Sequence, residues 1–322
     1  MSYAKLIRQI ELGDGLDFVD ARNLAAALLD GGVPELETAA LLMTLNQHDP
    51  GLDAWLGMHA ALAERLPAFV APATPYRTVI LPSYHGVRKC AHLTPLLALL
   101  LKSFGIPVLI HGVLDGGGGG TAAAYVLREL GVMPCSNVAQ VNARLRDQGI
   151  AFAPVALLSS GLASLLALRA RLGVESIATR LAVLADVMGA ESVRVTPALR
   201  SEELPGMAAL LTAVGGRALL LKGCEGEAFA DPQLRPEISF YHDGGCERIC
   251  AAQQATSVTT DMPPSDARTT GAWVRGVLDG SQGVPLALRS QLAACLYTAG
   301  YTDDLNQARA ITSINGFGRI AA

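Results

Sequence analysis

Aromatic side chains, long apolar runs and regularly spaced cysteines are all scarce in this chain, and each scarcity excludes a class of protein. Aromatic residues make up 5% of the 322 residues although 51% are hydrophobic, a composition suited to alanine- and leucine-rich helices packed on a sheet. The longest apolar run, residues 93–101, contains Pro95 and ends at Lys102. It is well short of the roughly 20 residues that a membrane span needs, so we expect no membrane partner.

Cysteine occurs without the rhythm of a disulfide scaffold. The six cysteines are spread over a long chain, as is usual for reduced and mostly buried thiols. Cys246 and Cys250 lie near His242, but their spacing is not the usual two-residue gap and no second ligand pair follows, so we expect no metal site. The N-terminal segment lacks an apolar signal core, and we therefore expect a cytoplasmic protein.

The charge balance restricts how the protein could contact nucleic acid. A formal net charge of −4 argues against a surface that is basic throughout, but it leaves room for a local basic groove. Most of the basic residues are arginines, which suit bidentate contact with phosphate or carboxylate but are also common in alanine-rich proteins. Composition alone therefore leaves the partner open.

The chain begins with four segments whose apolar residues recur at helical spacing. They predict helices at residues 3–12, 18–30, 34–46 and 52–65. We therefore expect residues 1–70 to form a helical lobe, joined by helices from about residues 161–188. Prolines in residues 67–78 predict an extended linker after the lobe.

From residue 79 onward strands and helices alternate. The apolar patterns predict strands at residues 79–81, 108–110, 192–195, 217–221 and 238–241, with a short apolar segment at 150–156. This order is typical of βαβ units. We therefore expect an α/β protein, in which a small all-helical lobe joins a large α/β domain (residues 71–322) with a central, mostly parallel sheet.

Residues 79–123 are the stretch around which the α/β domain is organised. A strand, a polar loop carrying Tyr84, Arg88 and Lys89, an apolar helix and a second strand follow one another. Two parallel strands joined by one helix form a right-handed crossover with both following loops at the carboxyl edge of the sheet. Open α/β folds bind ligands at that edge, so we expect the functional site there.

Taken in this order, the elements resemble anthranilate phosphoribosyltransferase, of glycosyltransferase family three. The most specific matches are GIPV at residues 105–108, His111-Gly112, LRELGV at residues 127–132 and RARLG at residues 169–173. The resemblance covers nearly the whole chain. It implies a phosphoribosyltransferase or nucleoside phosphorylase-like fold and a homodimer formed through the N-terminal helical lobe.

The donor loop departs from the pattern of that family. There a GTGGD sequence brings backbone N–H groups close to the pyrophosphate of phosphoribosyl pyrophosphate, which requires residues without side chains. The matching positions in this chain are Pro82, Ser83, Tyr84, His85 and Gly86. A proline also removes one donor. At the start of the following helix, Asn-Ile-Ser-Thr becomes His92-Leu93-Thr94-Pro95, and the lysine before His111 becomes Ile110.

The magnesium motif is altered as well. The family holds the metal with an Asp-Glu pair after a glycine, and the matching positions after Gly226 are Ala228 and Phe229. Glu225 and Glu227 are near enough that a small shift could supply one ligand. These changes argue against an active anthranilate phosphoribosyltransferase, so we expect no cofactor, and magnesium only if a transferase activity remains.

The replacement loop, PSYHGVRK at residues 82–89, is similar to that of DNA-binding paralogues without transferase activity. The resemblance implies nucleic-acid binding, to DNA or RNA, largely through phosphates and with little sequence preference. We assign no catalytic residue. The candidate nucleic-acid or phosphate-binding residues are Ser83, Tyr84, Arg88, Lys89, His92, Thr94, His111, Gly112 and Arg169.

Several of these residues also have a plain structural interpretation. Arg88 and Lys89 could be ordinary solvated charges, and Tyr84 could pack against the loop rather than stack on a base. His111 could serve to shape the end of its strand, and Arg169 could bind an anion or pair with a carboxylate. The alternative function is a phosphoribosyltransferase or glycosyltransferase with an altered substrate.

Overall fold

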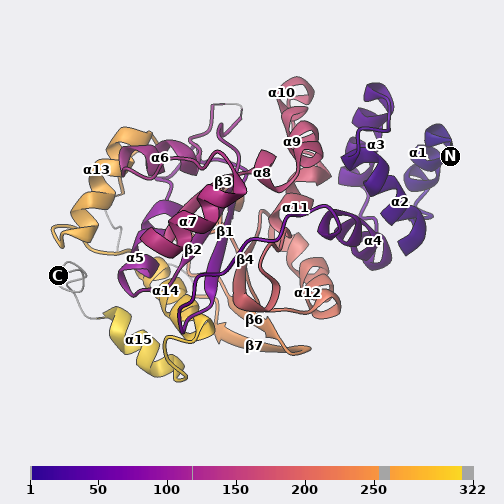
Figure 1. Ribbon diagram of the computed structural model, residues 1–322. Coiled ribbons are helices and arrows are strands. Elements are labelled where there is room, and N and C mark those ends of the chain that lie inside the picture. Colours follow the sequence, from indigo (N-terminus) through magenta and orange to yellow (C-terminus); the bar gives the residue numbers. More distant parts are fainter. Residues whose placement is uncertain (1, 118, 254–261, 314–322) are drawn as a thin grey trace.

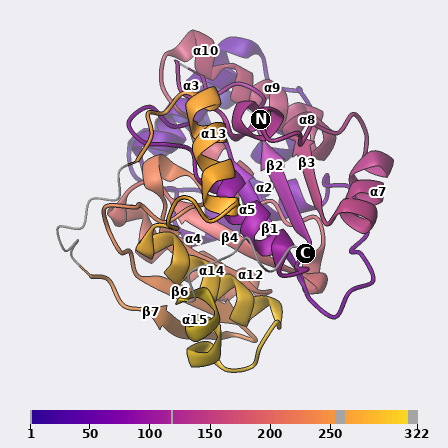
Figure 2. The same ribbon diagram turned by 90° about the vertical axis from the view of Figure 1, so that its left-hand side faces the viewer.

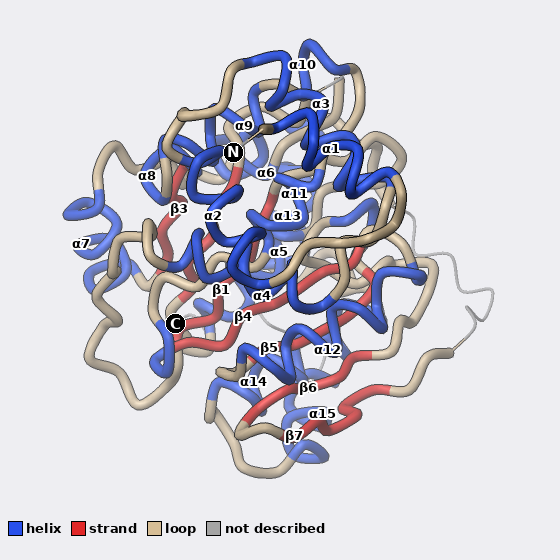
Figure 3. Tube along the Cα trace, turned by 90° about the vertical axis from the view of Figure 1, so that its right-hand side faces the viewer, coloured by secondary structure: helices blue, strands red, loops and turns tan. Residues whose placement is uncertain are grey.

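The computed structural model describes residues 2–117, 119–253 and 262–313 (Figure 1). Within these residues one seven-stranded sheet has the order β3-β2-β1-β4-β5-β6-β7 (Figure 3). Its strands are β1 (Thr78–Ser83), β2 (Val108–Gly112), β3 (Ile150–Pro154), β4 (Ser192–Ala198), β5 (Ala218–Lys222), β6 (Ile238–His242) and β7 (Gly245–Cys250). Strands β1 to β5 pair in parallel and β6 and β7 antiparallel, which confirms the predicted mostly parallel sheet.

The strand order reverses direction at β1. The chain runs from β1 to β2 and β3 on one side, and then returns so that β4 pairs with the other edge of β1. Such a switch point separates the loops on its two sides and leaves a crevice at the carboxyl ends of the strands. Ser83 pairs in register with Gly112, so the loops after β1 and β2 leave the sheet together, as the crossover predicts.

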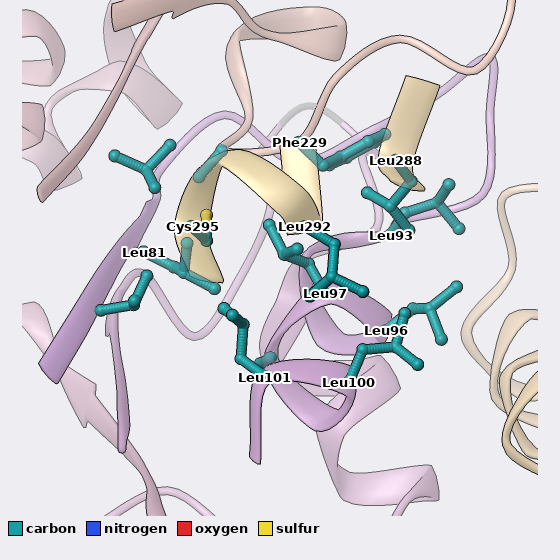
Figure 4. Packing of buried hydrophobic residues seen from close by; sticks show 14 of the residues in the cluster. Leu81, Leu93, Leu96, Leu97, Leu100, Leu101, Phe229, Leu288, Leu292 and Cys295 are labelled. Atoms are coloured by element: carbon teal, nitrogen blue, oxygen red, sulfur yellow. The ribbon is translucent and has the colours of Figure 1, made fainter. Parts of the chain in front are cut away.

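The crossover helix α5 (Thr94–Ser103) forms the centre of the core. Pro95 lies in its first turn, where the missing N–H of proline costs no helical hydrogen bond. Its leucines pack against α14 (Leu286–Ala299), and Figure 4 shows Leu97 beside Leu292. Burying one leucine contributes about 1.5–3 kcal/mol, so this apolar layer fixes α5, the helix that follows the loop after β1.

The N-terminal helices form a lobe beside the sheet (Figure 1). They are α1 (Tyr3–Glu11), α2 (Phe18–Leu29), α3 (Glu35–Gln47) and α4 (Leu52–Ala63). Three later helices contact them: α9 (Ser160–Ala167) packs on α2, α11 (Ile177–Val183) packs on α3, and α12 (Leu204–Val214) packs on α4. A Cβ at Gly161 would lie 1.7 Å from the carbonyl oxygen of Leu29, so only glycine permits this approach of α9 to α2.

The remaining helices cover the α/β domain, and Figure 2 shows α13 and α15 on the side opposite the lobe. They are α6 (Ala123–Glu129), α7 (Val138–Gln148), α8 (Val155–Leu158), α12 (Leu204–Val214), α13 (Ala267–Leu278) and α15 (Leu305–Ser313), whereas the short α10 (Arg169–Leu172) packs on α9. None of the described helices has both the length and the apolar character to cross a bilayer. Strand β7 was not predicted, because its largely exposed residues show no alternating apolar pattern.

Candidate functional site

The loop after β1, residues 84–93, meets the segment after β5 at the carboxyl edge of the sheet. That segment opens with a short 3-10 turn, Cys224–Gly226. Two glutamates, Glu225 and Glu227, extend from this segment toward the loop. The backbone of the β1 loop is therefore held from the opposite side of the switch point.

Glu227 is fully buried and binds the backbone of the loop. Its Oε1 accepts hydrogen bonds from the N–H of His85 at 2.9 Å and of Gly86 at 2.7 Å, and its Oε2 lies 3.3 Å from Nε2 of His92. Burial alone would raise the pKa of Glu227, but the charge and hydrogen bond of His92, with His85 and Ser83, lower it to about 2. A charged carboxylate thus lies where the N–H groups of the loop point.

Glu225 binds the next part of the same loop. Its carboxylate accepts from the backbone N–H of Arg88 at 3.0 Å and of Lys89 at 2.9 Å. Burial opposes ionisation, but these N–H groups outweigh it and lower the pKa of Glu225. Its φ of 49° lies in the left-handed region that non-glycine residues seldom adopt. The following Gly226 has no side chain to clash with the His85 ring, which a Cβ would approach to 2.7 Å.

Gln291 of α14 fixes the segment that carries these glutamates. This fully buried side chain donates to the carbonyl oxygen of Ala228 at 2.9 Å and accepts from the N–H of Ala230 at 2.7 Å. Ala228 and Phe229, which stand where the family has its magnesium ligands, are buried and have no side-chain oxygen. Glu225 and Glu227, the nearby carboxylates, direct oxygens at backbone N–H groups. The side chains at this position therefore do not fit the family's magnesium site.

A second group of charges lies over the outer side of the loop. Glu175 accepts from Arg169 at 2.8 Å through one oxygen and lies 2.8 Å from Nδ1 of His85 through the other. The Arg169 guanidinium also donates to the carbonyl oxygen of His85 at 3.3 Å. Burial would raise the pKa of Glu175, but His85 and Arg169 lower it. Of the two predicted roles of Arg169, the structure shows pairing with a carboxylate.

Tyr84 and His111 form a buried pair behind the loop. The Tyr84 hydroxyl lies 2.7 Å from Nδ1 of His111. Burial raises the pKa of Tyr84 and lowers that of His111 to about 3, so both groups are neutral at pH 7. Of the two alternatives for Tyr84, the structure shows packing within the loop. At Gly112 a Cβ would lie 1.9 Å from the carbonyl oxygen of Ser83, which explains the glycine.

The nine predicted site residues differ in how far they are exposed to solvent. Arg88 and Lys89 are exposed, and Arg169 is half-buried. The Arg88 guanidinium donates to the carbonyl oxygen of Gly117 at 3.1 Å. The buried ones are Ser83, Tyr84, His92, Thr94, His111 and Gly112. The structure thus gathers all nine around one loop and its neighbouring strand ends, but it exposes mainly the basic pair.

A cavity of about 240 Å³ opens beside this charged group, between the lobe and the sheet edge. Its lining includes Asn46 from the lobe, His85 and Glu175 from the site, Arg180 from α11, and Arg200 from the segment after β4. The site is therefore accessible from the crevice between lobe and sheet.

No family model matches this sequence. The chain is 35% identical over 311 residues to the uncharacterized protein YbiB of Escherichia coli (strain K12), spanning 93% of this chain and 95% of that protein. It belongs to the same family as YbiB. It is also 26% identical over 226 residues to an anthranilate phosphoribosyltransferase of Methylocella silvestris, spanning 69% of this chain and 62% of that enzyme.

Solved structures of anthranilate phosphoribosyltransferases share the fold of this YbiB relative. Anthranilate phosphoribosyltransferase from Thermus thermophilus matches with a TM-score of 0.76 and 21% identity, covering 98% of this chain and 95% of that one. The enzyme from Saccharomyces cerevisiae in complex with PRPP and Mg matches with a TM-score of 0.71 and 13% identity, covering 95% and 90%. The chain therefore has an anthranilate phosphoribosyltransferase-like fold.

Some residues of the site did not emerge from the sequence. Glu225 and Glu227 were considered only as possible magnesium ligands, and Glu175 was not singled out. The available signal was two glutamates flanking a glycine just after a buried strand, at the edge where the β1 loop lies. The sequence alone does not show that their partners are backbone N–H groups.

Proposed function

We propose that this YbiB relative is a cytoplasmic protein that binds nucleic acid through phosphate contacts with little sequence preference. The observation that carries the proposal is the occupation of the β1 loop N–H groups by Glu225 and Glu227. A pyrophosphate approaching those groups would meet two negative charges at close range. The same loop directs Arg88 and Lys89 outward, where they suit contact with a phosphate backbone.

The neighbourhood of Arg88 supports an extended contact. The Ser265 hydroxyl donates to the carbonyl oxygen of Arg88 at 3.1 Å and so brings the start of α13 next to the loop. Arg268, in the first turn of α13, is exposed. Basic side chains from two segments near one crevice favour a local groove, which is compatible with a net charge of −4.

A titration of labelled single- and double-stranded DNA and RNA by fluorescence anisotropy at several salt concentrations tests the proposal. We expect binding that weakens steeply with salt, because each phosphate contact releases counterions. The double variant Arg88→Ala with Lys89→Ala should bind less tightly, with the slope of log affinity against log salt reduced by about 2. The backbone N–H groups of both residues remain available to Glu225 in this variant.

Lys102 and Arg146 provide a matched control. They are likewise one exposed lysine and one exposed arginine, but they lie at the amino-terminal end of the parallel sheet. A Cβ at Gly149, just before β3, would lie 3.7 Å from the Lys102 side chain. Lys102→Ala with Arg146→Ala should leave binding unchanged. Absence of salt-sensitive binding, or equal losses in both double variants, would refute the proposal.

The competing function, glycosyl transfer with an altered substrate, requires Glu227 to leave His85 and Gly86. We expect no bound magnesium and no stabilisation by phosphoribosyl pyrophosphate. A ligand at one hundred times its dissociation constant stabilises a folded protein by about 2.7 kcal/mol, which thermal unfolding detects. Such a shift with phosphoribosyl pyrophosphate and magnesium would favour the transferase instead.

We also propose a homodimer formed through the N-terminal helical lobe. The support is apolar surface on the lobe: the exposed fractions of Leu12, Val19 and Leu36 are 73%, 60% and 80%. Val19→Glu with Leu36→Glu should give monomers in size-exclusion chromatography with light scattering. Leu234→Glu with Leu286→Glu, two exposed leucines of the α/β domain, should leave the mass unchanged. A dimer that survives the lobe substitutions would place the interface elsewhere.

A further inference from the structure

The thiol of Cys90, in the β1 loop, faces the thiol of Cys224, in the segment after β5. Their sulfur atoms lie 3.0 Å apart although the two residues are 134 positions apart in the sequence, and both cysteines are free. Cys90 directly follows the exposed Arg88-Lys89 pair, and Cys224 directly precedes Glu225. The Cys90 thiol also donates to Oε1 of Glu225 at 3.4 Å. The proposed nucleic-acid contacts do not use these thiols.

A metal ion is the first ligand to consider, because Cys90, Cys224 and Glu225 converge within 4.8 Å. Tetrahedral zinc with bonds to sulfur of about 2.3 Å would hold two sulfurs about 3.8 Å apart. The observed separation of 3.0 Å is shorter. The Glu225 carboxylate is also engaged by the N–H groups of Arg88 and Lys89, and among the described residues this cluster offers three ligands rather than four.

We propose that Cys90 and Cys224 are a covalent modification site that closes to a reversible disulfide by exchange with a small-molecule disulfide. The thiolate of Cys90 attacks one sulfur of the reagent and releases the first reagent thiol. The thiolate of Cys224 then attacks the Cys90 sulfur of the mixed disulfide and releases the second. Two protein S–H bonds and one reagent S–S bond are replaced by one protein S–S bond and two reagent S–H bonds.

The environments of the two thiols set the order of these steps. Cys90 is half-buried, so a reagent reaches it first, whereas Cys224 is buried. The hydrogen bond with Cys90 and burial raise the pKa of the Cys224 thiol, which makes it a poor first nucleophile. Once Cys90 carries the mixed disulfide, Cys224 is already adjacent to the sulfur that it attacks. The product joins the β1 loop covalently to the segment that carries Glu225 and Glu227.

The test uses the full chain and does not depend on nucleic-acid binding. The protein is incubated with oxidised glutathione, its free thiols are blocked, and unreduced tryptic peptides are identified by mass spectrometry. We expect the peptide of residues 90–102 to be linked to that of residues 223–248, and the link to disappear with dithiothreitol. The intact protein should lose the mass of two hydrogen atoms.

Three variants make the result specific. The peptide of residues 223–248 also contains the exposed Cys246, so Cys246→Ser should keep the link while Cys224→Ser and Cys90→Ser each abolish it. Circular dichroism confirms that each variant is folded. The proposal is overturned if glutathione remains on Cys90 without a link, or if the link survives Cys224→Ser. One equivalent of bound zinc that protects both thiols would equally overturn it.

Discussion

The Glu227 carboxylate and the backbone N–H of Gly86 lie 2.7 Å apart across 141 positions of sequence. Gly86 has a φ of 70°, which glycine adopts without strain, and this conformation is part of the turn that presents its N–H to Glu227. A loop whose N–H groups could have bound an external anion thus carries an internal one. The scaffold keeps the geometry of a ligand-binding edge, while its backbone donors stabilise the protein itself.

Glu227→Ala should destabilise the protein strongly. It leaves the buried N–H groups of His85 and Gly86 unsatisfied, and it removes the carboxylate beside His92. We expect the free energy of unfolding in urea to fall by about 3 kcal/mol, the scale for breaking a buried charged pair. Glu225→Ala should cost about 1 kcal/mol, because its partners lie at the exposed part of the loop.

Added pyrophosphate tests whether Glu227 occupies an anion-binding position or is only a structural carboxylate. In Glu227→Ala the N–H groups of His85 and Gly86 become available, so sodium pyrophosphate should raise the urea midpoint of this variant. The wild-type midpoint should not respond, because its own carboxylate fills the position. Equal responses of the two proteins would contradict the view that Glu227 occupies an anion site.

Two glycines should respond in opposite directions to replacement by alanine. Gly112→Ala places a Cβ 1.9 Å from the backbone of Ser83, so β1 and β2 must separate, and we expect a loss of about 3 kcal/mol. Gly206 lies exposed in α12, and apart from the backbone of that helix no atom of the described residues lies within 4 Å of the position that an alanine methyl group would take there. Gly206→Ala should therefore stabilise the protein by about 0.5–1 kcal/mol. Urea denaturation measures both.

The sequence alone predicted the fold and the edge of the sheet at which the site lies. Apolar periodicity and the βαβ order are local signals, and they located β1, α5 and β2 to within a few residues. Strand β7 was not predicted from the sequence, because an edge strand with largely exposed side chains need not show an alternating apolar pattern.

The contacts within the site could not be predicted in the same way. The bonds from Glu227 to the β1 loop join residues that are 141 and 142 positions apart, and no local pattern encodes them. Tyr84, in the loop, and His92, at the start of the following helix, were predicted to contact a ligand, yet both are buried. A polar side chain can be buried when a specific partner satisfies it, and that partner is known only after the chain has folded.

Tyr84→Phe isolates the buried hydrogen bond to His111. The substitution removes the hydroxyl that lies 2.7 Å from Nδ1 and leaves this nitrogen without its partner. We expect a loss of about 1–3 kcal/mol in the free energy of unfolding. Tyr3→Phe is the control, because the Tyr3 hydroxyl makes an exposed bond to Gly32 and should contribute little. Similar losses in both variants would show that the buried pair has no special role.

The pH dependence of stability should report the burial of His111. Burial lowers its pKa from 6.5 to about 3, so between these values the unfolded chain binds a proton that the folded protein does not. The free energy of unfolding should therefore fall as the pH falls below 6.5, by at most about 1.4 kcal/mol per pH unit. Nearer pH 4.5, protonation of Glu227 in the unfolded chain acts in the same direction, because its folded pKa is lowered to about 2.

Urea denaturation at pH values from 7 to 5 checks this slope in wild-type protein and in His111→Gln. The variant should lose most of the slope, with a remainder from His59, whose pKa burial also lowers. His48→Gln, at a half-buried position after α3, is the matched control for the loss of an imidazole elsewhere in the chain. If His111→Gln and wild-type protein show parallel slopes, His111 is not the group that couples folding to protons in this range.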